Sequence, residues 1–176
     1  MDPIPQVFLD FSRRKLQQFA ARIEDCLGRL TEEQIWARGA DNENAIGNLV
    51  LHLSGNVRQW IVSGVGGEAD IRQRDAEFAA REGPSAAELA ARLRGAVAEA
   101  VAVLESLPAE RLAERVCIQG YDVTILEAIY SVVEHLSGHT GQIIFATKLL
   151  TGKDLGYYLH LSGSPLPGGC GAALTP

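Results

Sequence analysis

The hydrophobic positions of this chain recur at intervals of three and four residues over four long stretches. This period places them on one face of a helix, so the pattern predicts four amphipathic helices. The stretches are about residues 5–27, 44–63, 85–107 and 124–150. Helices of this length bury their apolar faces against one another, and we therefore expect an all-α protein built as a four-helix bundle.

Capping signals support the predicted helix starts. Ser85 and Thr124 are each followed three residues later by a glutamate, which is the spacing of a capping box. A third capping box begins at Thr31 and opens a short helical turn. Residues 75–78 favour a second short helical turn. Residues 115–118 are the one extended piece that the pattern suggests, so we expect a strand content close to zero.

The connections differ in length and composition. The charged segment 68–83 and the segment 109–122 exceed the two to eight residues that usually join adjacent antiparallel helices, which makes long crossover connections compatible with the pattern. No second composition regime is present, so residues 1–161 are expected to form a single domain. Residues 162–176 are rich in Gly and Pro and predict a flexible tail.

Charge and cysteine usage narrow the function class. The 176 residues include 16 basic and 22 acidic side chains, a net charge of −6, which argues against a nucleic-acid partner. No apolar run approaches the length of a transmembrane helix, and the N-terminus lacks the pattern of a secretory signal. Cys26, Cys117 and Cys170 show no CxxC spacing, and an odd count suits a reduced, cytoplasmic protein.

Three of the four histidines fall within predicted helices. His135 and His139 are four residues apart, so their rings project from one helix face about one turn from each other. His52 lies on the second predicted helix, which is either a neighbour or a diagonal partner of the fourth. Three imidazoles make a candidate metal site. The chain has no HExxH and no Glu-x-x-His pairs, which excludes metalloprotease and di-iron interpretations.

Polar side chains flank the apolar stripe on both helices that carry these histidines. They are candidates for contacts around the ion, although amides on helix surfaces are more often only solvated. The candidates are Asn48, Asn56, Gln59, Gln142 and Glu134. Glu134 is next to His135, but its helical phase turns it about 100° away. The sequence therefore identifies no general acid or base beside the ion.

The sequence allows two interpretations for several other polar and aromatic residues. The charged cluster before Phe78 forms either an anion-binding rim or, as we favour, a salt-bridged segment that pins the connection. The tyrosines line either a pocket or the core, and His160 is either a fourth ligand or, more simply, a surface histidine. The roles left open are those of Arg72, Arg74, Tyr157, Tyr158 and His160.

Three separated segments resemble the DinB/YfiT-like family in order and spacing. Residues 124–155 resemble its last bundle helix, which carries two metal-ligand histidines four apart, and residues 48–53 resemble its second helix, which supplies the first ligand. Residues 66–78 and 156–158 resemble hallmarks of a subgroup without assigned activity. The resemblance covers about residues 8–161.

The resemblance implies a four-helix bundle of unusual connectivity with a divalent ion, Zn or Ni, held by His52, His135 and His139. It implies a metal-dependent enzyme of the thiol S-transferase or hydrolase type, with a low-molecular-weight thiol or another small molecule as its partner. A non-enzymatic metal- or ligand-binding bundle is the alternative. We also expect a homodimer, formed through apolar surface left over on the first and third predicted helices.

Overall fold

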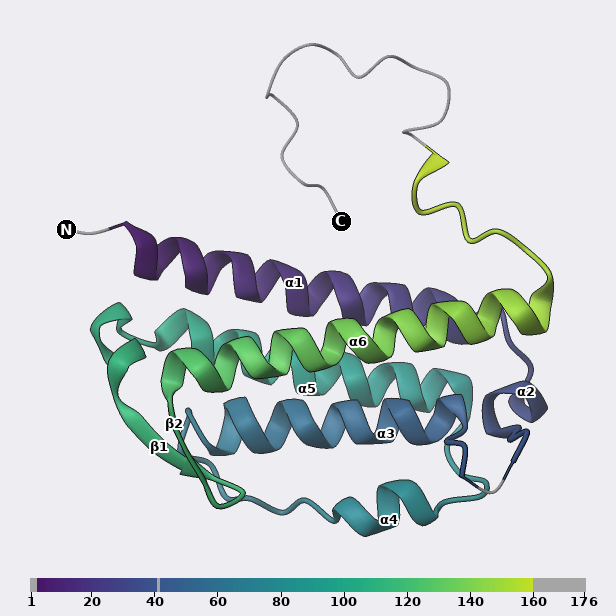
Figure 1. Cartoon of the computed structure of the whole chain (residues 1–176), viewed down its shortest axis with the longest axis horizontal. Helices are drawn as coiled ribbons and strands as arrows, with labels where there is room; N and C mark the ends of the chain where they lie inside the picture. Colours follow the sequence, from purple (N-terminus) through teal and green to yellow (C-terminus); the bar gives the residue numbers. More distant parts are fainter. Residues whose placement is uncertain (1–2, 41, 160–176) are drawn as a thin grey trace.

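Four long helices pack side by side in the computed structural model, which describes residues 3–40 and 42–159 (Figure 1). They are α1 (Ile4–Leu27), α3 (Ile46–Val57), α5 (Ala86–Ser106) and α6 (Ile125–Thr151). Helices α1 and α3 occupy opposite corners, and each of them packs against both α5 and α6. The predicted four-helix bundle is therefore confirmed, and α3 is a direct neighbour of α6.

A long crossover joins α3 to α5. Both helices begin at the same end of the bundle, where the ring of Trp36 lies against Gly47 at the start of α3 and Gly83 just before α5. The connection therefore returns along the whole bundle, and it carries the short helix α4 (Arg74–Ala79) on the outside (Figure 1). The short helix α2 (Glu32–Trp36), which joins α1 to α3, begins at the predicted capping box of Thr31.

A β-hairpin corrects the expectation of almost no strand. Strand β1 (Arg115–Ile118) follows the 3-10 turn η2 (Ala109–Ala113) and was expected as an isolated extended piece. It pairs antiparallel with a second strand, β2 (Tyr121–Thr124). The intervening Gln119 and Gly120 both have positive φ, 53° and 81°, as the tight turn between two strands requires. The hairpin leads directly into α6 and packs Ile118 against Gly64.

The second predicted helix is not regular to its end. The α-helical part ends at Val57, and a π-helical turn, η1 (Arg58–Ser63), completes it. A π turn holds one more residue than an α turn, so it changes which side chains face inward. Ile61 and Val62 are consequently buried, whereas Trp60 stays half-exposed beside α6.

The core consists of the predicted apolar stripes. One residue from each long helix illustrates this core, and each is at most 1% exposed: Leu16, Leu53, Leu93 and Ile129. Burying such a side chain contributes about 1.5–3 kcal/mol. The boundaries also follow the predicted chemistry, since Ser85 and Thr124 form complete capping boxes.

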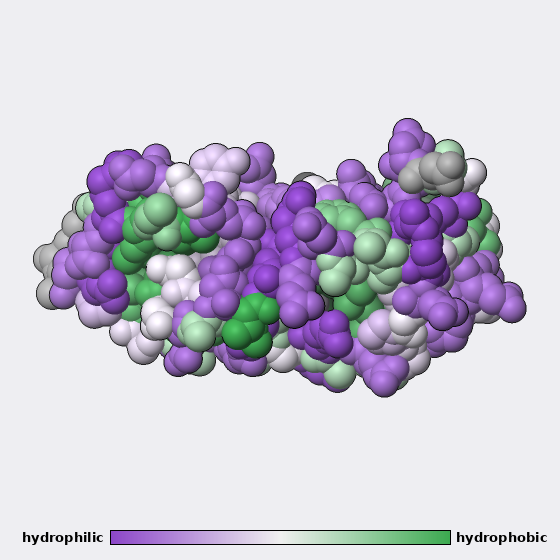
Figure 2. All heavy atoms as spheres, turned by 90° about the horizontal axis from the view of Figure 1, so that it is seen from below, coloured by the Kyte–Doolittle hydropathy of each residue, from purple (hydrophilic) through white to green (hydrophobic). Residues whose placement is uncertain are grey.

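Large apolar side chains remain exposed on two of the four long helices. On α1 and α6 they are Ile4, Val7, Phe11, Leu126, Tyr130, Phe145, Leu149 and Leu150. Helix α5 carries none of the large exposed apolar residues, and the apolar side chains that it exposes are the alanines Ala87, Ala91, Ala98 and Ala102. On the face that carries α4, apolar patches are separated by hydrophilic side chains (Figure 2).

Two predictions concern residues that the structure does not describe. The tail 162–176, with Cys170, lies outside the described residues, and so does His160. Within the described part of the chain, no helix is both long and apolar enough to cross a membrane.

Candidate metal centre

His52, His135 and His139 meet between α3 and α6. Their rings form a triangle, with centroids 4.9 Å apart for His52 and His135, 5.4 Å for His52 and His139, and 4.5 Å for His135 and His139. One ligand nitrogen from each ring lies within 4.8 Å of the other two. The sequence-based grouping of these histidines is thus confirmed as a cluster able to hold a metal ion.

Neighbouring antiparallel helices explain how residues so far apart in sequence meet. His52 points from α3 into the α3–α6 interface and is buried, and the i, i+4 pair on α6 is half-buried opposite it. Among the described residues, these are the only ones that form such a metal-ligating group of three or more.

The donor set fits a transition metal. An ion with bonds of about 2.0–2.1 Å to tetrahedral nitrogen ligands places those nitrogens about 3.3 Å apart. Nε2 of His52 lies 2.8 Å from Nε2 of His135, and the third nitrogen is within 4.8 Å, so small side-chain rotations reach that geometry. Imidazole nitrogens suit Zn²⁺ or Ni²⁺, whereas Mg²⁺ and Ca²⁺ prefer oxygen ligands.

Gln142 orients the ring of His139. Its side-chain oxygen lies 2.7 Å from Nδ1 of His139 and accepts the proton there. The Nε2 lone pair of His139 is then free for an ion. Gln142 was one of the predicted polar contacts, and the structure confirms its place beside the cluster.

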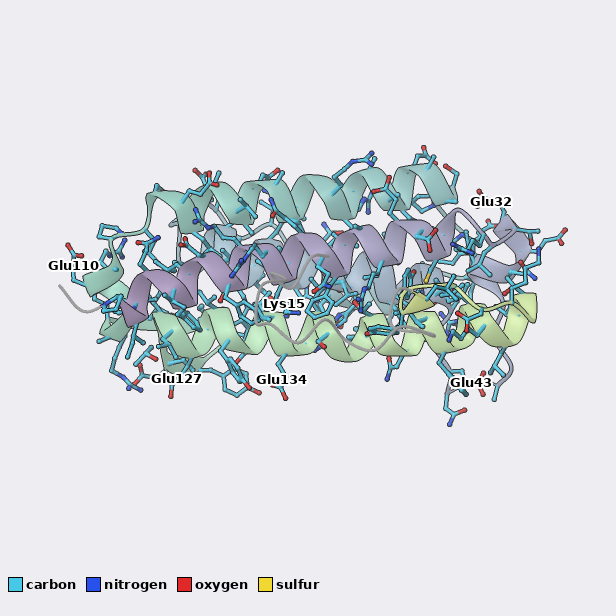
Figure 3. The ribbon with its side chains drawn as sticks, turned by 90° about the horizontal axis from the view of Figure 1, so that it is seen from above. Lys15, Glu32, Glu43, Glu110, Glu127 and Glu134 are labelled. Atoms are coloured by element: carbon cyan, nitrogen blue, oxygen red, sulfur yellow. The ribbon has the colours of Figure 1, made fainter. Side chains whose placement is uncertain are left out.

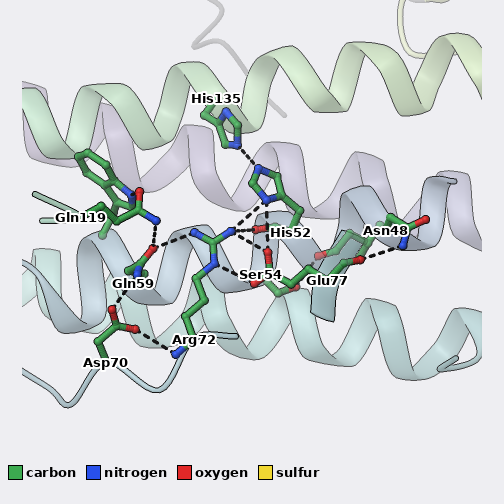
Figure 4. A network of polar contacts seen from close by, with 11 residues as sticks. Asn48, His52, Ser54, Gln59, Asp70, Arg72, Glu77, Gln119 and His135 are labelled. Carbon is green, nitrogen blue, oxygen red and sulfur yellow. Dashed lines mark hydrogen bonds and ion pairs between the residues drawn. The ribbon is translucent and has the colours of Figure 1, made fainter. Parts of the chain in front are cut away.

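An ion pair from the crossover holds the far side of His52 (Figure 4). Arg72 donates from Nε to Oε1 of Glu77 at 2.8 Å and from Nη2 to Oε2 at 2.7 Å. Both partners face Nδ1 of His52: Nη2 of Arg72 lies 2.9 Å from it, and Oε2 of Glu77 lies 3.3 Å from it. The side chains are only 4% and 11% exposed.

These contacts define two tautomers of His52. Arginine can only donate, so its bond to Nδ1 requires a proton on Nε2 of His52, where the ring can donate to His135. Donation from Nδ1 to Glu77 instead leaves Nε2 bare, which is the tautomer that binds a metal. Glu77 thus supplies the acceptor that a metal-bound His52 needs.

The sequence interpretation of this charged cluster was incomplete. Arg72 and Glu77 do pin the connection as favoured, but the structure also brings them to His52, which the sequence did not indicate. Arg74 instead stacks on Phe78, with its guanidinium carbon 4.9 Å from the ring centroid. The ring of Phe78 in turn lies 4.8 Å from that of His52.

A glycine makes room for the ion pair. A Cβ atom at Gly55 would lie 2.1 Å from Oε1 of Glu77 and 2.8 Å from Nε of Arg72. Such approaches are impossible without moving one of these buried side chains. Gly55 is therefore the residue of α3 that lets the crossover reach the back of His52.

The surroundings favour the neutral form of the two half-buried histidines of α6. Burial, together with the nearby His139, His52 and Arg72, lowers the pKa of His135 from the ordinary 6.5 to about 4. Burial also lowers the pKa of His139, although the hydrogen bond to Gln142 opposes that shift. Burial opposes ionisation of Glu77, but hydrogen bonds from Arg72 and His52 hold the pKa of this carboxyl below its usual value.

An open cleft of about 520 Å³ lies beside the histidines. It is lined by Asn56, Trp60, Ser131, Val132, Glu134, His135, Gly138, His139 and Gln142. Glu134 projects outward from α6 (Figure 3) and also lines this open cleft. Glu134 was one of the predicted polar candidates, and the structure places it on the rim of this cleft.

The remaining candidate residues lie further away. Asn48 donates to the backbone oxygens of Glu77 and Ala80 and so fastens α4 to α3. Gln59 accepts a hydrogen bond from Arg72. Tyr157 donates to Asp25 and packs against Cys26 on α1, which makes it a structural anchor rather than a part of this cleft.

Comparison with solved structures defines the class of fold. A conserved protein from Enterococcus faecalis superposes with a TM-score of 0.71 at 17% identity, over 82% of this chain and 97% of that one. The DinB-like protein YjoA from Bacillus subtilis gives 0.64 at 16% identity, over 84% and 96%. A DinB-like protein from Bacillus cereus gives 0.63 at 18% identity, over 82% and 91%. The fold is therefore DinB-like.

The family itself is given by sequence. A family model described as "Protein of unknown function (DUF1572)" matches residues 4–161, and the chain belongs to that family. No curated protein matches the sequence.

Proposed function

We propose that the chain binds one Zn²⁺ or Ni²⁺ ion at His52, His135 and His139 and acts as a metal-dependent enzyme of the thiol S-transferase or hydrolase type. The observation that carries the proposal is the convergence of three ring nitrogens within 4.8 Å beside an open cleft. Structural zinc sites are closed by four protein ligands, whereas catalytic sites use three and keep a position open.

The chain's own residues prepare this site. A divalent ion bound to three neutral imidazoles lowers the pKa of a coordinated thiol or water and supplies a nucleophile at neutral pH. Gln142 accepts the Nδ1 proton of His139, Glu77 offers the acceptor for the metal-binding tautomer of His52, and burial favours neutral His135. The cleft then admits a small molecule to the edge of His135 and His139.

The choice of thiol chemistry comes from the DinB-like resemblance. The alternative remains a non-enzymatic bundle that binds a metal or ligand, as a stress-response or interaction protein. The open cleft with a carboxylate on its rim favours the enzyme. We expect no nucleic-acid or membrane partner. We place the protein in the cytoplasm, where Cys26 and Cys117 stay reduced.

A thiol-transfer assay tests the proposal. Zinc- or nickel-loaded protein is incubated with a panel of small thiols and an electrophile such as monochlorobimane, in parallel with an ester panel. Accelerated thiol conjugation or ester hydrolysis that disappears in metal-free protein and in His135→Gln supports the enzyme. Turnover equal to that of His135→Gln in both panels would leave the non-enzymatic alternative.

A further inference from the structure

The cleft beside the histidines has a distinct polar character away from the ligands. Helix α3 contributes Asn56 one turn after His52, and η1 contributes Trp60. Helix α6 contributes Ser131 and Glu134. These side chains, rather than the histidines, would contact the part of a bound molecule that does not touch the metal.

Asn56 presents an unsatisfied acceptor at this place. Its carboxamide oxygen is buried from solvent and accepts no hydrogen bond within the described structure. Buried polar atoms nearly always form a hydrogen bond, so an unpaired one indicates a hydrogen-bond partner that is supplied from outside the chain. Because Asn56 lines the cleft, a donor on a bound molecule is the partner that the site provides for.

The charge of the cleft lining is negative. Glu134 is the one charged side chain, apart from the histidines, among the described residues that line it, and neither Lys nor Arg is among them. A carboxylate or phosphate on the ligand would therefore meet Glu134 without a compensating cation. A positively charged group would be attracted to the same position.

The nearest guanidinium is already occupied. Arg72 gives its Nε and Nη2 protons to Glu77 and His52, and its Nη1 binds Gln59 (Figure 4). With its side chain 4% exposed, it lies behind His52 and does not line the cleft. Arg58 pairs with Glu99 of α5 and is likewise not a lining residue. Neither of these two arginines is left to recognise an anionic ligand in the cleft, and Arg74, which stacks on Phe78, is not among its described lining residues either.

We propose that the cleft selects a thiol whose second group is a hydrogen-bond donor, best an ammonium, and discriminates against thiols that carry a negative charge. The inference rests on the proposed function, because the thiol sulfur is taken to occupy the open position of the metal. Asn56 accepts from the donor group, and Glu134 compensates its charge. These two residues are thus assigned to ligand binding and not to metal binding.

Three thiols of matched size test this selectivity. Cysteamine, 2-mercaptoethanol and 3-mercaptopropionate carry an ammonium, a hydroxyl and a carboxylate on the same two-carbon spacer. Each is titrated into cobalt-loaded protein, and binding is followed by the visible spectrum of the cobalt. Affinities are expressed per thiolate, because the three thiols differ in thiol pKa. We expect cysteamine to bind at least tenfold more tightly than 3-mercaptopropionate.

Variants separate the two residues. Glu134→Gln should remove most of the preference for cysteamine, whereas Glu110→Gln, the same charge change at one end of the bundle (Figure 3) and outside the cleft lining, should preserve it. Asn56→Ala should lower the affinity for cysteamine and for 2-mercaptoethanol at least fivefold. The affinity for 3-mercaptopropionate should stay unchanged. Metal affinity, measured separately by competition with a chromophoric chelator, should be the same in all of them.

The outcomes distinguish this inference from the proposed function. If the protein binds no metal, the proposed function fails. If metal binds but 3-mercaptopropionate binds as tightly as cysteamine, or Glu134→Gln behaves as Glu110→Gln, the metal site stands and the proposed selectivity is wrong.

Discussion

Nε2 of His52 and Nε2 of His135 lie 2.8 Å apart across the α3–α6 interface. Without a metal, one of these nitrogens carries the proton of a hydrogen bond, and with a metal both lone pairs face the same ion. Glu77 accepts the proton that His52 then carries on Nδ1. We therefore expect the ion pair behind His52 to influence metal binding.

Removing the charge of Glu77 tests this dependence. In Glu77→Gln, Arg72 remains buried without its counter-charge, so we expect a loss of about 3 kcal/mol in the free energy of unfolding. Zinc affinity should fall about 10- to 100-fold, because the acceptor for Nδ1 of His52 is weakened. Urea unfolding and chelator competition measure the two effects.

Asp75→Asn is the matched control for that experiment. Asp75 lies on the same short helix but is exposed, and its substitution should change stability by no more than about 0.5 kcal/mol. Equal effects of the two variants on zinc affinity would remove Glu77 from the account.

A pair of glycine variants tests the packing of the ion pair. In Gly55→Ala the new methyl group meets Glu77 and Arg72, and we expect a loss of about 2–4 kcal/mol despite the better helix propensity of alanine. In Gly95→Ala, on α5, nothing lies within 4 Å of the added Cβ, and stability should rise by about 0.5–1 kcal/mol. Thermal unfolding compares them, and a stabilised Gly55→Ala would contradict the observed packing.

The stability of the metal-free protein should depend on pH through His135. Its pKa is about 4 in the folded chain and near 6.5 in the unfolded chain, so the unfolded state binds the proton more readily. Stability is therefore complete above about pH 6.5 and falls as the pH drops towards 4. Urea unfolding at pH 7 and pH 5 should show this loss, and His135→Gln should reduce it. An identical loss in both proteins would mean that His135 is not held neutral.

We expect a homodimer, and the large exposed apolar side chains favour an interface that includes α1 and α6. Phe145 and Leu149 are 65% and 70% exposed on α6, and Val7 is 60% exposed on α1. Light scattering should give a mass of twice 18.9 kDa for the wild type. The Phe145→Glu variant should have a mass closer to that of the monomer, whereas Tyr121→Glu, in the hairpin, should keep the mass of the dimer. A mass of 18.9 kDa at all concentrations would refute the dimer.

The sequence was most informative where its signals are local. The three-and-four periodicity and the capping boxes at Ser85 and Thr124 predicted the long helices, since both depend only on neighbours within one helix. The spacing of His135 and His139 likewise fixed one helix face. Placing His52 beside them required the resemblance as well, because spacing alone left α3 and α6 adjacent or diagonal.

What the sequence missed depends on the path of the chain in space. Arg72 reaches His52 because the crossover runs along α3 and Gly55 leaves a gap, and neither fact is visible in a local pattern. The π turn brings Trp60 to the cleft, and strand β2 was missed although it is as long as the expected β1, because it forms only by pairing with that strand. The phase of one helix argued against Glu134 as an acid or base beside the ion, but the cleft that it lines is formed by two helices.

The central claim is that three histidines bind one metal ion, and a direct measurement is the zinc and nickel affinity and stoichiometry of purified protein. We expect one ion per chain for the wild type and for His160→Gln. We expect at least about a 100-fold loss of affinity for each single substitution of His52, His135 or His139, and no specific binding in the triple glutamine variant. Binding of one ion by the triple variant with the affinity of the wild type would contradict the account.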